Sequence, residues 1–153
     1  MTSNKNERRN FISNAAKIGG AAGMAALAMA VPGQAAGGKI EKNKAGVRLG
    51  NLLFTSGLTG VERGDAGSFG GSVGQQTRTI LQKHKDNLEA VGSSLDNVLK
   101  VTVFMADIKV EKPAMNKAYA EFFTGHKPSR SAVGVEFPDS RTKVEIEMIA
   151  WIP

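Results

Sequence analysis

Residues 142–152, at the C-terminal end of the chain, alternate between two kinds of side chain. One set is apolar throughout and comprises Val144, Ile146, Met148, Ala150 and Ile152. The other set begins with Lys143, Glu145 and Glu147 and ends with Ile149 and Trp151. An alternation with a period of two residues is typical of a β-strand that turns one face to a core. The chain must therefore form a sheet, and a second layer must cover its apolar face.

Other segments have the composition of strands, rich in β-branched and aromatic residues. Short strands are predicted at 47–49 and 52–56, because Gly50-Asn51 between them suits a hairpin turn. A central strand is predicted at 97–106 and a further strand at 131–135. The turn-forming residues at 137–140 predict that the 131–135 strand folds back on the last strand.

Two segments have the periodicity of helices. Apolar residues recur at spacings of three and four between 72 and 91, with Ser72 suited to the N-cap and Gly92 to the C-terminal turn. A second helix is predicted to have Pro113 in its first turn and to end at Gly125. Between the first hairpin and the first helix, residues 57–72 are rich in glycine and predict a loop.

The predicted order is therefore β-β-α-β-α-β-β, an α+β fold in which two helices cover one face of a mainly antiparallel sheet. Two helices of this length cannot cover both faces. Ile149 and Trp151 would then form an exposed apolar patch beside Glu145 and Glu147. Such patches usually mark interfaces, so we expect a closed homo-oligomer that buries the second face.

The first 36 residues predict an export signal that is removed from the mature protein. Arg8-Arg9 is followed by Phe11-Ile12, then by a weakly apolar run at 18–31 and by Pro32-Gly33 beside small residues. This layout resembles the twin-arginine signal, so we expect contact with the twin-arginine export machinery and a periplasmic location. A membrane anchor is the alternative, but it needs about 20 strongly apolar residues. Residues 37–45 are predicted to be a mobile lead-in, and 46–153 the folded domain.

Composition excludes several kinds of function. The chain has no cysteine and only two histidines, so thiol chemistry, disulfide frameworks and multi-histidine metal sites are not expected, and no metal or cofactor is predicted. The formal charge is +6, and half of this excess lies in residues 1–36. The remaining charge is ordinary for a soluble domain, so nucleic acid is not an expected partner.

The residues left for chemistry are Arg130, Glu145, Glu147 and the hydroxyl groups of Thr55 and Ser56. The predicted hairpin would place Arg130 opposite residues 145–148. An arginine beside a glutamate has two interpretations that this pattern does not separate. The pair could be an ion pair between strands, or Arg130 could bind a substrate carboxylate while the glutamate holds a water molecule.

Several segments, in order along the chain, resemble the RidA/YjgF family. They are Gly46–Gly57, Val98–Asp107, Asn116 with Tyr119, Phe122 and Phe123, Pro128–Val133, and Lys143–Ala150. The resemblance covers about residues 46–152. It implies the same β-β-α-β-α-β-β fold, described as chorismate-mutase-like, assembled as a homotrimer with active sites in clefts between subunits.

The resemblance also implies roles for individual residues. Arg130 would bind the substrate carboxylate, Glu145 would hold the hydrolytic water, and Ser56, Gly57 and Asn116 would contact the substrate. The implied reaction hydrolyses reactive 2-enamino or 2-imino acids to 2-oxo acids and ammonia without a cofactor. The alternative is a non-catalytic periplasmic trimer that binds small carboxylates or a protein partner. A ribonuclease role, also known in the wider family, fits the charge pattern poorly.

Overall fold

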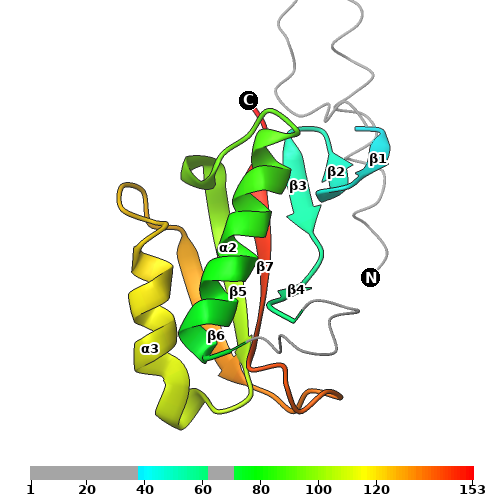
Figure 1. Cartoon of the computed structure of the whole chain (residues 1–153). Coiled ribbons are helices and arrows are strands. Elements are labelled where there is room, and N and C mark those ends of the chain that lie inside the picture. The colour runs from blue at the N-terminus through cyan, green and yellow to red at the C-terminus, as the bar shows by residue number, and fades with distance from the viewer. Residues whose placement is uncertain (1–37, 62–70) are drawn as a thin grey trace, which may run out of the picture. The chain divides into compact units, whose positions relative to one another are not determined.

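The alternating segment at the C-terminus forms strand β7 (Val144–Trp151) in the computed structural model, which describes residues 38–61 and 71–153 (Figure 1). The predicted export signal and residues 62–70 of the predicted loop lie outside the described residues. From Val144 to Ala150 the strand alternates between buried and half-buried side chains, as its sequence predicts. Its apolar face packs beneath the helices and forms the centre of the core.

Strand β7 lies inside a seven-stranded sheet with the order β1-β2-β3-β7-β5-β6, and β4 also pairs with β7. The other strands are β1 (Ile40–Asn43), β2 (Gly46–Leu49), β3 (Leu52–Thr55), β4 (Leu58–Thr59), β5 (Val98–Met105) and β6 (Ser129–Gly134). The predicted hairpin around Gly50-Asn51 joins β2 to β3, and Gly50 has a φ of 60° that suits glycine at such a turn. Most pairings are antiparallel, as predicted.

The pairing of β6 differs from the sequence prediction. The turn residues at 137–140 suggested a hairpin between β6 and β7, but β6 pairs with β5, and the two strands are parallel. Strand β5 in turn pairs with β7, so it separates the two strands that were expected to be neighbours. The cause is the connection through helix α3 (Ile108–Ala120), because a strand–helix–strand crossover places its two strands parallel. Residues 135–143 then pass the end of β5 to reach its other side.

The first helix forms where the periodicity predicts it. Helix α2 spans Val73–Glu89, and Ser72 and Gln75 form a reciprocal capping box at its start. Gly92 follows its end with a φ of 79°, a conformation that favours glycine. A short 3-10 helix, η2 (Leu95–Asn97), leads into β5.

The second helix begins five residues before Pro113. Asp107 caps α3, because its carboxylate accepts a hydrogen bond from the backbone of Val110. The prediction that Pro113 lies in the first turn is therefore wrong, and this proline is inside the helix. Asp107, and not Pro113, determines where the helix begins, since its side chain satisfies a backbone N–H that is otherwise unpaired.

The predicted mobile lead-in contains strand β1, which pairs with β2 along its whole length. The side chain of Asn43 accepts hydrogen bonds from the backbone N–H groups of Ala45 and Gly46, and these bonds stabilise the turn between β1 and β2. Asparagine favours such turns because its side chain bonds to backbone two or three residues ahead.

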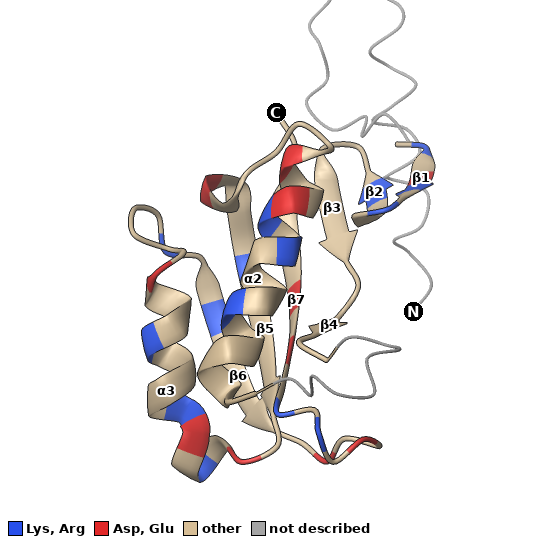
Figure 2. Cartoon of the chain, viewed as in Figure 1, with Lys and Arg blue, Asp and Glu red and all other residues tan. Residues whose placement is uncertain are grey.

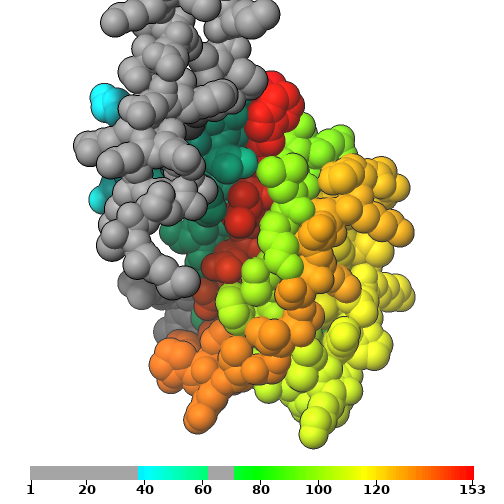
Figure 3. Space-filling model, turned by 180° about the vertical axis from the view of Figure 1, so that it is seen from behind, coloured from blue at the N-terminus to red at the C-terminus, as the bar shows by residue number. Residues whose placement is uncertain are grey.

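Both helices pack on one face of the sheet, which confirms the predicted α+β layers (Figure 1). The opposite face, which we call the open face, carries no other described element (Figure 3). Exposed apolar side chains of the open face include Leu52, Phe54, Val133 and Trp151. Within the part of the chain that the structure describes, no helix has the length and apolar character needed to cross a membrane.

Candidate functional site

Arg130 projects from edge strand β6 to the helix side of the sheet. Its register partner on β5 is Val101, whose side chain is fully buried under the helices, and partners in a ladder point to the same face. The Arg130 guanidinium lies over the Tyr119 ring, with 4.5 Å from Cζ to the ring centre. One of its terminal N–H groups donates to Oδ1 of Asn116 at 2.8 Å. Two side chains of helix α3, Asn116 and Tyr119, therefore fix the position of the Arg130 guanidinium.

An open depression of about 270 Å³ lies beside this guanidinium, which we call the α3 pocket. It is lined by Asn116, Tyr119, Ala120, Phe123, Lys127, Pro128 and Arg130. Tyr119 and Phe123 stack with their ring centres 4.5 Å apart and form an aromatic base. Burial raises the pKa of Tyr119 to about 12, although the nearby Arg130 charge opposes this shift, so the hydroxyl keeps its proton at neutral pH.

Glu145 projects from β7 to the open face. Its register partners are Phe104 on β5 and Thr59 on β4, and the side chain is half-buried. The carboxylate lies directly against Gly57, because a Cβ built on Gly57 would overlap Oε1 of Glu145. Ser56, the residue before Gly57, is exposed. Glu145 and Gly57 are therefore in contact, and Ser56 precedes Gly57 in the chain.

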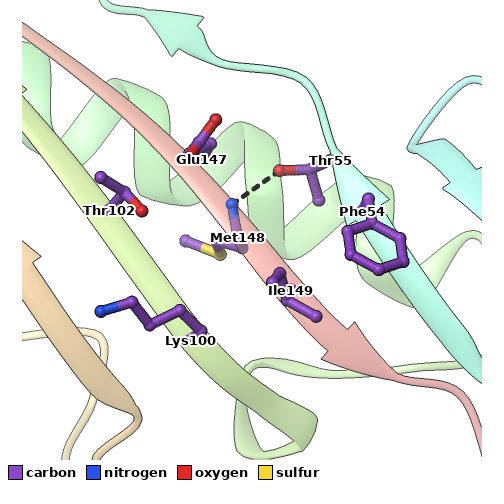
Figure 4. Close-up of a pocket in the computed structure, with 7 residues that line it drawn as sticks. All are labelled: Phe54, Thr55, Lys100, Thr102, Glu147, Met148 and Ile149. Carbon is purple, nitrogen blue, oxygen red and sulfur yellow. Dashed lines mark hydrogen bonds between the residues drawn. The ribbon is translucent and has the colours of Figure 1, made fainter.

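An irregularity in the ladder brings Ser56 and Gly57 beside Glu145. Between the Phe54–Ile149 and Leu58–Ile146 pairs, the β3–β4 side has one residue more than β7. The Thr55 hydroxyl accepts a hydrogen bond at 2.9 Å from the backbone N–H of Met148, as Figure 4 shows. This bond satisfies a β7 backbone group while Ser56 and Gly57 leave the regular ladder.

A second depression, of about 160 Å³, lies on the open face between β3, β7 and β5 (Figure 4). It is lined by Phe54, Thr55, Lys100, Thr102, Glu147, Met148 and Ile149. Lys100 extends toward β6 and donates from Nζ to the Ser131 hydroxyl at 2.6 Å. Apolar Phe54 and Ile149 thus lie next to charged side chains, as the sequence predicts for this face.

The structure does not bring Arg130 and Glu145 together within one chain. The prediction that Arg130 lies opposite residues 145–148 is wrong, because β5 intervenes and Glu145 is in register, through Phe104, with Val133. Val133 points to the same face as Glu145 and is three residues, an odd number, from Arg130, so Arg130 and Glu145 point to opposite faces. The spacing of strands and the rise per residue put the Cα atoms of Arg130 and Glu145 about 14 Å apart.

The predicted site residues therefore fall into two groups. Arg130 and Asn116 belong to the α3 pocket, and Glu145, Ser56 and Gly57 belong to the open face. Tyr119 and Lys127 also line the α3 pocket, although neither was predicted as a site residue. The spacing of Asn116, Tyr119 and Phe123, at three and then four residues, was the available signal, because such residues share one face of a helix.

Among the described residues, both helices carry basic and acidic side chains (Figure 2). On α3, Glu111 lies between Lys109 and Lys112, whereas on α2 the basic residues precede Asp86 and Glu89. Arg78 of α2 forms an ion pair with Glu121 at 2.7 Å, and Lys85 pairs with Glu89. The described residues also contain no cluster of histidine, aspartate and glutamate that could hold a metal ion.

Comparison with known proteins gives a consistent result. The family model described as Endoribonuclease L-PSP matches residues 38–152. A RutC family protein of Pyrococcus horikoshii is 38% identical over 105 residues, which are 69% of this chain and 82% of that protein. The 2-iminobutanoate/2-iminopropanoate deaminase of Escherichia coli is 37% identical over 108 residues, 69% of this chain and 83% of the deaminase.

Solved structures agree with these sequence relationships. The crystal structure of yeast Mmf1 superposes with a TM-score of 0.64 and 32% identity, covering 76% of this chain and 92% of Mmf1. A match of the family model to most of the chain, together with relatives above 30% identity, establishes the relationship. The chain belongs to the Endoribonuclease L-PSP family, which is the RidA/YjgF family that its sequence motifs resemble.

Proposed function

We propose that this protein is a RidA-like deaminase that hydrolyses reactive 2-enamino and 2-imino acids to 2-oxo acids and ammonia. The relative named as an imine deaminase in Escherichia coli, at 37% identity, supports this reaction class. The observation that carries the proposal is Arg130, whose guanidinium is held by Asn116 and Tyr119 rather than by a carboxylate.

The surroundings of Arg130 suit a carboxylate ligand. No ion pair to Arg130 is found within residues 38–61 and 71–153, although four other ion pairs are. Stacking on Tyr119 uses the face of the guanidinium, and the bonds to Asn116 and Met115 use two of its five N–H groups, so three remain to donate to a carboxylate. In this proposal Arg130 binds the 1-carboxylate that every 2-imino acid carries.

Glu145 supplies the other part of the reaction. Its carboxylate accepts a proton from a water molecule as the water oxygen bonds to C2 of the substrate. The substrate nitrogen gains that proton, which gives a carbinolamine with OH and NH2 on C2. Glu145 then accepts the proton of this hydroxyl and passes it to the nitrogen, so the C–N bond breaks with its electron pair on nitrogen and ammonia leaves as the C=O bond forms. Gly57 leaves space beside Oε1 of Glu145, which a side chain at that position would fill.

The two groups can act together only if subunits associate. Arg130 and Glu145 face opposite sides of the sheet, so a substrate that contacts both must lie between two copies of the chain. The exposed apolar side chains of the open face support such an assembly, since 43% of both Phe54 and Trp151 is exposed. We propose a homotrimer with three equivalent sites at its interfaces, because each closed heterologous interface joins two different surfaces.

A binding function without catalysis is the second candidate. The α3 pocket contains Arg130 but no carboxylate among its lining residues, so one chain alone can hold an anion and cannot activate water. A trimer that fails to bring Glu145 to this pocket would bind small carboxylates only. The proposal of catalysis and this alternative differ in turnover, not in binding.

We also propose that residues 1–36 direct export through the twin-arginine machinery, which would make the mature protein periplasmic. The Arg8-Arg9 pair before a weakly apolar run supports this proposal. Replacing both arginines by lysine in a bacterium with this machinery should leave the full-length precursor in the cytoplasm. A mature-sized periplasmic product from that variant would contradict the proposal.

Ammonia release from imino acids generated in place tests the proposed reaction. The Arg130→Ala variant should lower kcat/KM on the order of a hundredfold, because a charged hydrogen-bonding anchor is lost. Arg78→Ala is the matched control, since Arg78 pairs with Glu121 outside the site. Carboxylate binding with no turnover by the wild-type protein would favour the binding function instead.

A further inference from the structure

The α3 pocket contains more positive charge than one substrate carboxylate requires. Arg130 lies on one side, and Lys127, from the connection between α3 and β6, lines the same depression. None of its lining residues is an aspartate or glutamate. Within the described residues neither cation forms an ion pair. The pocket therefore has two positive charges that no described carboxylate balances.

The other polar groups of the pocket are also arranged as donors. Oδ1 of Asn116 already accepts a hydrogen bond from Arg130, so the amide nitrogen of this side chain remains to donate. The Tyr119 hydroxyl is buried and has no hydrogen-bond partner among the described residues. Lys127, Arg130 and the Asn116 amide therefore offer N–H groups, which suit an acceptor-rich ligand such as an anion.

The walls of the pocket limit where Lys127 can extend. The stacked rings of Tyr119 and Phe123 line the pocket, and buried Pro128 follows Lys127 directly. Proline restricts the backbone of the residue before it, which limits the directions in which the Lys127 side chain can extend. Lys127 and Arg130 are both exposed, so water screens a contact with either cation and its strength is that of a surface ion pair.

We propose that the α3 pocket binds a second carboxylate of the substrate through Lys127, so the preferred substrates are 2-imino dicarboxylic acids. Arg130 binds the carboxylate next to the imine carbon, and Lys127 binds the distal one. Two monoanionic groups match the two cations, and a volume of about 270 Å³ accommodates a chain of four or five carbons. This inference rests on the proposed deaminase function and specifies its substrate class.

The test compares kcat/KM for imino acids generated by amino-acid oxidases from aspartate and glutamate with values for those from alanine and 2-aminobutyrate. The wild-type protein should prefer the dicarboxylic imines. Lys127→Gln should lower the ratio of dicarboxylic to monocarboxylic kcat/KM about fivefold, the upper range for a solvent-accessible ion pair. Lys127→Arg should retain the ratio. Lys112→Gln, an exposed lysine of α3 outside the pocket, is the matched control and should not change it.

Titration of the stable products separates this inference from the proposed function. We expect 2-oxoglutarate to bind more tightly than 2-oxobutanoate, and Lys127→Gln to reduce that difference. A wild-type preference for monocarboxylic imines, or a ratio that Lys127→Gln does not change, would overturn the inference and leave the deaminase proposal standing. If no imine is hydrolysed, the deaminase proposal fails, and equal binding of the two products would overturn the pocket assignment as well.

Discussion

Arg130 and Glu145 lie on opposite faces of one sheet, with strand β5 between the strands that carry them. Arg130 is in register with buried Val101, whereas Glu145 is in register with half-buried Phe104 on the open face. Because side chains cannot cross a packed sheet, one chain cannot place both groups on one small substrate. Any reaction that uses both residues therefore requires an interface between subunits.

The contact between Gly57 and Glu145 predicts the effect of one added methyl group. In Gly57→Ala the new Cβ would overlap Oε1 of Glu145, so the carboxylate must move. We expect kcat/KM to fall tenfold or more, since a displacement of about 1 Å at a reacting group can cost a hundredfold. Because the far end of a flexible side chain is what moves, the thermal midpoint should change little.

Gly125→Ala is the matched control for this variant. A Cβ on Gly125 would meet only Oδ1 of Asp96, at an ordinary contact distance of 3.8 Å. Equal activity of the Gly57→Ala and Gly125→Ala variants would contradict the prediction, because it would show that activity does not depend on the exact position of the Glu145 carboxylate.

Much of the fold follows from local sequence patterns. The alternation in 142–152 predicts which side chains of β7 are buried, and Ser72 and Gly92 predict both ends of α2. These features depend on residues within one turn or one strand, where backbone preferences and burial act together. The open apolar face also followed, because two helices cannot cover both sides of a sheet.

The strand with which β6 pairs could not be predicted from such local patterns. Pro138, Asp139 and their neighbours have the composition of a turn, and the structure does contain bends there. A turn does not determine which strand comes next in a sheet, because a strand–helix–strand crossover can place a third strand in between. This one topological error reversed the predicted relationship of Arg130 to Glu145, since register parity decides which face a side chain occupies.

The hydrogen bonds of Gln76 are expected to stabilise the segment that leads into β7. Its buried side chain donates to the backbone carbonyl of Arg141 at 2.8 Å and accepts from the backbone N–H of Lys143 at 2.9 Å. Gln76→Ala should lower the free energy of unfolding by about 2–3 kcal/mol, because two backbone groups lose their partner. Urea denaturation measures this change.

Gln82→Ala is the comparison for Gln76→Ala, since Gln82 lies on the same helix but is exposed, and its side chain donates to Asp86. We expect a change within about 0.5 kcal/mol for this surface substitution. Equal losses in the two variants would mean that the hydrogen bonds of Gln76 do not stabilise the start of β7.

Because His84 is buried, we expect the protein to lose stability in mild acid. Burial lowers the pKa of His84, although its hydrogen bond to the Ile146 carbonyl, at 2.8 Å, opposes the shift. Below about pH 6.5 the unfolded chain binds a proton that the folded chain does not, so the free energy of unfolding falls as the pH falls. One titrating group can lower the free energy of unfolding by no more than about 1.4 kcal/mol per pH unit.

His84→Gln should remove this part of the pH dependence, because glutamine can donate to the same carbonyl without titrating. His126→Gln is the control and should keep the wild-type slope, since His126 is exposed. Thermal unfolding between pH 5 and pH 7 measures both. The same slope in wild-type and His84→Gln proteins would contradict a buried neutral histidine.

A site shared by two subunits is the central feature of the proposed mechanism, and mixing of variant subunits tests it directly. Arg130→Ala and Glu145→Gln subunits, each with little activity alone, are unfolded together and refolded in equal amounts, with the trimer confirmed by light scattering. Random pairing across cyclic interfaces gives some sites both intact residues, so ammonia release should recover to about one quarter of the wild-type rate. Mixed trimers that stay inactive would contradict a site in which one subunit supplies Arg130 and its neighbour supplies Glu145.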